Sequence, residues 1–100
     1  MDFQLDEGED GVCVHLSGDL NFSANSDFRA ILDKLGTYSG SMVTFDLSNV
    51  ERIDSVGLGL LYIAKEEVEE SGRIRLKAPQ SGIMKMLELT EADADFDIIP

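Results

Sequence analysis

A short segment, residues 53–61, combines a carboxylate, a hydroxyl and two glycines. It reads Ile-Asp-Ser-Val-Gly-Leu-Gly-Leu-Leu, so Asp54 and Ser55 stand just before Gly57 and Gly59. A serine here can be phosphorylated only by a separate kinase, which supplies the base and the bound nucleotide that the serine itself lacks. The phosphate would add roughly −1.5 to −2 charge beside Asp54. Ser55 is therefore a candidate phosphorylation site.

The same residues also have structural explanations. Either Asp54 or Ser55 can cap a helix by accepting a free backbone N–H, which is worth about 1 kcal/mol, and residue types alone favour this role. Each glycine in the first helical turns costs about 1 kcal/mol relative to alanine. Such glycines indicate either close helix-to-sheet packing or the approach of a partner. No Lys-Ser/Thr pair follows Gly57 and Gly59, so ATP hydrolysis is not expected.

The first third of the chain predicts a hairpin and a helix. Apolar and polar residues alternate in two stretches that are joined by an acidic turn, with Phe3 and Leu5 in the first and Val12, Val14 and Leu16 in the second. From Ser23 the spacing becomes helical, with Ser23 as the cap and Gly36 after the last apolar residue. The inward residues of this helix are expected to be Ala24, Phe28, Ile31, Leu32 and Leu35.

The rest of the chain predicts a short strand at 43–47, a helix from Asp54-Ser55 to about Gly72, a strand at 73–78 and a helix after Pro79. The first of these helices has an apolar stripe of Leu61, Ala64 and Val68. The strand alternates Ile74, Leu76 and Ala78 with Arg73, Arg75 and Lys77. This pattern is typical of a sheet that has one face covered by helices and the other exposed to solvent. The last helix is expected to direct Ile83, Met86, Leu87 and Thr90 inward. Phe96, Ile98 and Ile99 allow a final strand.

This order, β-β-α-β-α-β-α with a possible final strand, predicts a single α/β domain over residues 1–100. The sheet is expected to be mixed, with four to five strands and with helices mainly on one face. The helix between 43–47 and 73–78 is the crossover that makes neighbouring strands parallel. Ligands and partners meet such sheets at the carboxyl ends of the strands, so the Asp54-Ser55 loop is expected on an accessible rim.

Composition excludes several classes of function. Twenty acidic and eight basic residues give a formal charge of −12, which disfavours nucleic acid as a partner. The amino terminus is acidic and no apolar run reaches membrane-spanning length, so we expect a cytoplasmic protein without membrane insertion. One cysteine and one histidine offer few metal ligands, and neither a metal nor a cofactor is expected.

Two weaker candidate sites have simpler explanations. His15 and Cys13 share one strand face, but a reactive pair would need a further residue from another strand. Asp93, Asp95 and Asp97 alternate like the opening of a calcium loop, yet Ile98 takes the glycine position, so a solvated acidic tail is favoured.

Four segments together resemble a STAS domain, and within that family the bacterial anti-sigma factor antagonists. The segments are Gly18-Asp19-Leu20-Asn21, Phe45-Asp46-Leu47-Ser48-Asn49-Val50, residues 53–61 and Met86-Leu87-Glu88-Leu89-Thr90. The resemblance extends over about residues 12–99, and its most specific part is Asp54 to Gly59.

The resemblance implies a partner-switching protein rather than an enzyme. Unphosphorylated, such a protein binds an anti-sigma factor that is also a serine kinase, and so frees the sigma factor. Phosphorylation at Ser55 would end that binding, and a PP2C-type phosphatase would restore it. The surface that the resemblance assigns to the partner comprises Asp19, Asn21, Asp54, Ser55, Val56, Gly57, Leu58 and Gly59.

The chain departs from the family pattern at two places. Val56 stands where members often carry a second small hydroxyl residue, which leaves Ser55 as the only acceptor in the motif, and residues 91–95 replace a glycine-led turn.

Two other functions stay open. One is a constitutive STAS subunit, such as the accessory protein of a bacterial lipid-transport ABC complex, in which Ser55 only caps the helix. The other is a small nucleotide-binding or hydrolytic protein.

Overall fold

The computed structural model describes residues 1–8, 11–35, 42–68 and 74–100, with the side chain of Val68 left out. Along the chain its elements are β1 (Asp2–Gly8), β2 (Gly11–Leu20), the 3-10 helix η1 (Phe22–Ala24), α1 (Asn25–Leu35), β3 (Met42–Ile53), α2 (Ser55–Val68), β4 (Ile74–Lys77), α3 (Ser81–Leu89), the 3-10 helix η3 (Ala92–Ala94) and β5 (Asp97–Ile99).

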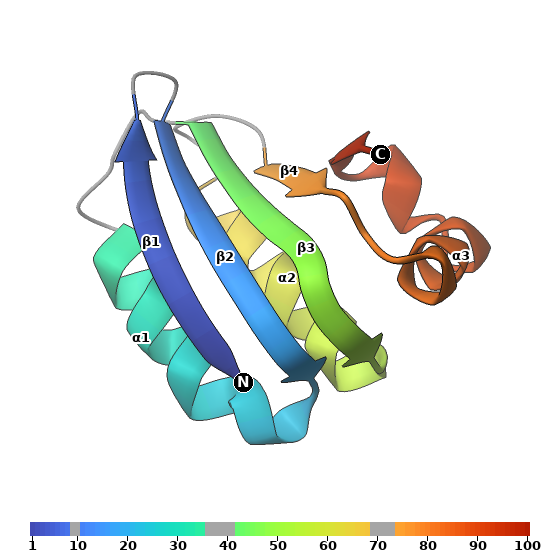
Figure 1. The fold of residues 1–100 in the computed structure, drawn as a ribbon, viewed down its shortest axis with the longest axis horizontal. Coiled ribbons are helices and arrows are strands. Elements are labelled where there is room, and N and C mark those ends of the chain that lie inside the picture. Colours follow the sequence, from blue (N-terminus) through green and yellow to red (C-terminus); the bar gives the residue numbers. More distant parts are fainter. Residues whose placement is uncertain (9–10, 36–41, 69–73) are drawn as a thin grey trace.

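The strands form one mixed sheet in the order β1-β2-β3-β4-β5. β1 and β2 pair antiparallel as a hairpin, and the other neighbours pair parallel. Helices α1 and α2 lie side by side against one face, and α3 lies beyond β4 (Figure 1). The predicted element order, the mixed α/β sheet and the helices on mainly one face are therefore confirmed, and the possible final strand is present as β5.

The core lies between the sheet and the helices. The inward residues of β2, which are Val12, Val14 and Leu16, are buried, as are Leu61 and Ala64 of α2. On α1, the buried residues Phe28, Ile31 and Leu35 follow helical spacing. The ring of Phe28 stacks on that of Phe45 from β3 with 5.6 Å between centroids. The alternating and helical patterns in the sequence thus predict the same core.

Strand β3 is much longer than the predicted segment 43–47. It continues to Ile53 through two register shifts against β2, each of which adds one residue to β3. In this half the inward side chains recur at every third position instead of every second, namely Leu47, Val50 and Ile53. The prediction was too short because β-bulges break the alternation by which a strand is recognised in a sequence.

The start of the first helix also differs from the prediction. Asn21, not Ser23, provides the cap: its Oδ1 accepts hydrogen bonds from the N–H of Ser23 at 3.0 Å and from the Ser23 hydroxyl at 2.6 Å. Asn21 has an extended backbone, which is the usual geometry of a capping residue. The chain then forms η1 before α1 begins.

Two residues expected to face inward do not pack there as predicted. Thr90 is exposed, and its hydroxyl donates at 2.8 Å to the carbonyl of Met86, which also accepts the backbone N–H of Thr90 at the end of α3. Ala78 follows β4 instead of belonging to it and has a positive φ of 54°. The predicted helix ends at Gly36 and Gly72, as well as Arg73, lie outside the described residues.

Candidate functional site

The carboxyl ends of β2 and β3 lie side by side and form one rim of the sheet (Figure 1). Leu20 pairs with Ile53 in the parallel register, and the backbone N–H of Asp54 donates to the carbonyl of Leu20 at 3.3 Å. The end of β2 is therefore bonded directly to the residue that precedes α2. This contact brings together the two sequence segments, 18–21 and 53–61, that were expected to share a surface.

Asp54 is the residue that caps α2. Its Oδ1 accepts the backbone N–H of Gly57 at 2.8 Å, and its carbonyl accepts the N–H of Leu58 at 2.9 Å. Ser55 is exposed, and its hydroxyl makes no hydrogen bond to any residue in the described part of the chain. Asp54 therefore has the capping role, and among the described residues the Ser55 hydroxyl has no hydrogen-bond partner.

The two glycines of α2 differ in their surroundings. A Cβ on Gly57 would lie 1.9 Å from the carbonyl oxygen of Leu20, so only glycine lets α2 approach β2 this closely. A Cβ on Gly59 would meet nothing within 4 Å. Close packing therefore accounts for Gly57, whereas packing within the described residues does not account for Gly59.

The eight residues expected to meet a partner lie together on this rim but are unequally accessible. Asp54, Ser55 and Val56 are exposed, whereas Gly57 is buried. The half-buried members are Asp19, Asn21, Leu58 and Gly59. Leu58 packs against the core, and the side-chain oxygen of Asn21 is used in its cap.

One exposed residue on this rim was not singled out from the sequence. Phe22, the first residue of η1, is 74% exposed. The signal was present, because Phe22 precedes the apolar stripe that begins at Ala24 and therefore has no place in the predicted core. Val56, which is 43% exposed, is the second large apolar side chain exposed on this rim.

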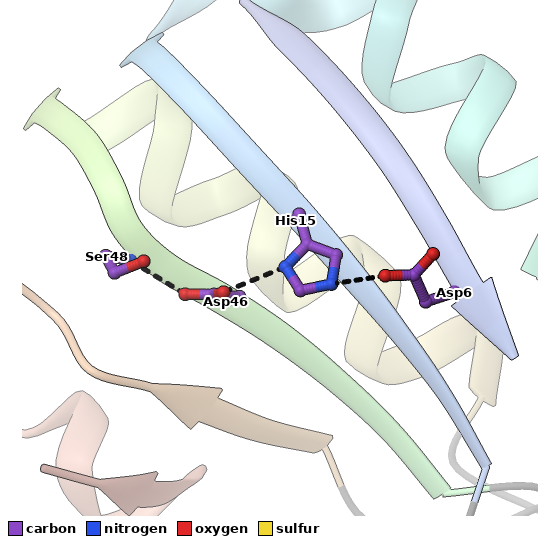
Figure 2. A network of polar contacts seen from close by, with 4 residues as sticks. All are labelled: Asp6, His15, Asp46 and Ser48. Atoms are coloured by element: carbon purple, nitrogen blue, oxygen red, sulfur yellow. Dashed lines mark hydrogen bonds and ion pairs between the residues drawn. The ribbon is translucent and has the colours of Figure 1, made fainter. Parts of the chain in front are cut away.

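A second group of polar residues lies on the sheet face that α1 and α2 leave open. Figure 2 shows His15 of β2 between Asp6 of β1 and Asp46 of β3. Its Nε2 lies 2.9 Å from Asp6 Oδ2, and its Nδ1 lies 2.8 Å from Asp46 Oδ2. An ionised carboxylate can only accept, so both contacts are hydrogen bonds when the imidazole carries two N–H groups. His15 thereby links three strands.

Asp46 also holds the backbone of β3 where its register shifts. Its Oδ1 accepts the N–H of Ser48 at 3.0 Å, and Gln80 Nε2 donates to the Ser48 carbonyl at 3.0 Å. Burial alone would raise the pKa of Asp46, but the hydrogen bonds from Ser48 and His15 and the charge on His15 outweigh it, so this pKa lies below its ordinary value.

The geometry does not support a reactive Cys13-His15 pair. Both ring nitrogens of His15 face carboxylates, and burial followed by the charge of Asp46 raises the pKa of the Cys13 thiol. Across residues 1–8, 11–35, 42–68 and 74–100, no three His, Cys, Asp or Glu side chains are grouped so that they could hold a metal ion. Within the same residues no helix is long and apolar enough to cross a membrane.

A family model described as "Mlab, STAS domain" matches residues 3–100. The chain belongs to the STAS family. The fold and the family that the sequence segments resemble are therefore confirmed.

Solved structures of anti-sigma factor antagonists share this STAS fold. The unphosphorylated form of the anti-sigma factor antagonist SpoIIAA is 25% identical, with a TM-score of 0.67 over 93% of this chain and 94% of that one. A candidate anti-sigma factor antagonist of Thermotoga maritima is 25% identical, with a TM-score of 0.84 over 98% and 86% of the two chains. The phosphorylated form of the Bacillus cell fate determinant SpoIIAA is 22% identical, with a TM-score of 0.71 over 99% and 92%.

Proposed function

We propose that this STAS domain is a phosphorylation-gated anti-sigma factor antagonist and not an enzyme. With Ser55 unphosphorylated it binds a serine kinase that is also an anti-sigma factor, and with Ser55 phosphorylated it releases that kinase. A PP2C-type phosphatase regenerates the binding form. The similarity to SpoIIAA, an anti-sigma factor antagonist that is described in an unphosphorylated form, supports this role.

The observation that carries the proposal is that the exposed Ser55 hydroxyl has no hydrogen-bond partner among the described residues. A serine that served as the helix cap would direct its oxygen to a backbone N–H and would be poorly available to a kinase. Here Asp54 takes that N–H, and Ser55 is left exposed at the first position of α2. A kinase can therefore reach the hydroxyl without unfolding the helix.

A phosphate on Ser55 would be only partly compensated within the chain. The N-terminus of a helix normally stabilises an anion through its free N–H groups. The Gly57 N–H is already bonded to the carboxylate of Asp54, and Asp19 lies on the adjoining strand end. The added charge of roughly −1.5 to −2 would therefore stay at the surface, where it weakens a complex without disturbing the fold.

The test uses the purified domain, MgATP and the serine kinase of the anti-sigma factor class from the same host. We expect one phosphate on the wild-type chain, mapped to Ser55, and none on Ser55→Ala. Phosphorylation or Ser55→Asp should weaken kinase binding at least tenfold in calorimetry, while Ser55→Ala should retain binding. A phosphate on another residue, or equal affinity of both forms, would reject the proposal.

A constitutive STAS subunit is the main alternative, and the same variant separates the two. In that case Ser55→Ala would leave the function of the host cell intact. The intact mass of the protein isolated from its host would also be the same with and without phosphatase treatment. A mass decrease on phosphatase treatment that Ser55→Ala abolishes would exclude the constitutive subunit.

A further inference from the structure

Phe22 is a large aromatic side chain that the fold leaves in water. At 74% exposure it gains little from packing within the chain. Burying a side chain such as Phe is stabilising, and most of that stabilisation stays unused in the free protein. Aromatic residues of this kind are enriched among the few residues that dominate the affinity of protein interfaces.

The turn that carries Phe22 is held by hydrogen bonds on both sides. Asn21 Oδ1 accepts from the backbone and the hydroxyl of Ser23, and the Asn21 carbonyl accepts the N–H of Ala24 at 3.0 Å. Ala24 is buried, so the far end of the turn is fixed in the core. Phe22 therefore projects from an ordered turn, which lowers the conformational entropy that a complex must overcome.

Phe22 lies on the same rim as Ser55. It follows Leu20 by two residues, as Ser55 follows Ile53 by two, and Leu20 and Ile53 are partners in the sheet. Helix η1 also contacts α2. Val56, next to Ser55, adds a second exposed apolar side chain. Among the described residues the rim thus carries two exposed apolar side chains, Phe22 and Val56, together with the Ser55 hydroxyl.

We infer that Phe22 is the anchor by which this chain docks on its serine kinase, and that the kinase has an apolar pocket which receives the ring. This inference rests on the proposed function. It also supplies a physical reason for the gating, since a phosphate on Ser55 would have to be desolvated in an interface built around apolar contacts. Because this chain has a net charge of −12, we expect the kinase surface around that pocket to be neutral or basic.

The test compares Phe22→Ala with Leu89→Ala. Leu89, at the end of α3, is 75% exposed, so the control removes an apolar side chain of similar exposure from a different helix. The Kd for the kinase without ATP should rise about tenfold or more for Phe22→Ala and stay unchanged for Leu89→Ala. In steady-state phosphorylation of Ser55, Phe22→Ala should raise KM and leave kcat unaltered, and Phe22→Leu should recover part of the affinity.

The outcomes separate the anchor from the proposed function. If Phe22→Ala is phosphorylated at Ser55 with the same Kd and KM as wild type, the proposal that Phe22 is a docking anchor is wrong. The proposed gating by Ser55 phosphorylation would still stand. A fall in kcat without a change in KM and Kd would also overturn the anchor, because Phe22 would then act on the chemistry and not on docking. If the kinase neither binds nor phosphorylates the wild-type chain, both proposals fail. Thermal unfolding of each variant checks that the fold is retained.

Discussion

Adjacent side chains at the start of α2 have separate tasks. Asp54 stabilises the helix from within by accepting the Gly57 N–H, and Ser55 offers its hydroxyl to the outside. A kinase substrate benefits from this division, because modification of the hydroxyl then does not remove the helix cap. Under the proposed phosphorylation of Ser55, the fold can stay the same while the surface charge changes.

The different contributions of Asp54 and Ser55 to the helix can be measured as free energies of unfolding. Asp54→Ala should lower the free energy of unfolding by about 1 kcal/mol, because it removes the cap. Ser55→Ala should change it by less than about 0.5 kcal/mol, as is usual for an exposed side chain. Urea denaturation of both variants gives the comparison. An equal loss in the two variants would show that Ser55 shares the capping role.

The sequence predicted both roles of this loop but could not assign them. Asp and Ser are about equally good caps, so residue type alone does not say which one bonds the helix. The assignment depends on where β3 ends, because the Asp54 N–H is bonded to Leu20 of the neighbouring strand. That position follows from two β-bulges in β3, which residue patterns do not reveal.

At the scale of elements, α2 packs closely against β2 because Gly57 has no side chain. Gly57→Ala should destabilise the protein by about 2 kcal/mol or more, because the new Cβ would overlap the Leu20 carbonyl. Gly59→Ala should be neutral or stabilise it by up to about 1 kcal/mol, since alanine favours the helix and the space is open. Thermal unfolding distinguishes the pair. Similar losses for both variants would contradict this packing.

Asp46 contributes to stability in a pH-dependent way. Because its pKa is lower in the folded chain than the ordinary value of 3.8, its contribution is present above about pH 4 and is lost as the pH falls through the folded pKa. Asp46→Asn should therefore lower the free energy of unfolding at pH 7 by about 1–2 kcal/mol. The difference from wild type should shrink as the pH falls below about 4.

The matched control is Asp33→Asn, which alters an exposed carboxylate on α1. Urea denaturation of the three proteins between pH 7 and pH 3 isolates the contribution of Asp46 from that of the other acidic residues. A constant difference between wild type and Asp46→Asn over this range would show that the hydrogen bonds of Asp46 do not favour its ionised form.

Across the whole molecule, the sequence predicted the covered face better than the open one. The apolar residues alternate in β2 and recur at helical spacing in α1, and both patterns indicate which side chains are buried. The core residues and the sheet face that carries helices could therefore both be predicted from the sequence. The contacts on the open face depend on register. His15 meets Asp46 because the two are register partners, and it reaches Asp6 diagonally, since the register partner of Asp6 is Cys13. No single segment encodes these contacts.

The carbonyl of Leu20 accepts the Asp54 N–H and lies close to the α-carbon of Gly57, so the end of β2 and the start of α2 are packed together at one corner. The serine at this corner is displayed on a preformed three-dimensional surface rather than on a pliable loop that could thread into a catalytic cleft. An enzyme that modifies it has to accept an intact globular shape. Recognition would then depend on geometry assembled from distant parts of the chain, and a short linear stretch around the serine would not reproduce it.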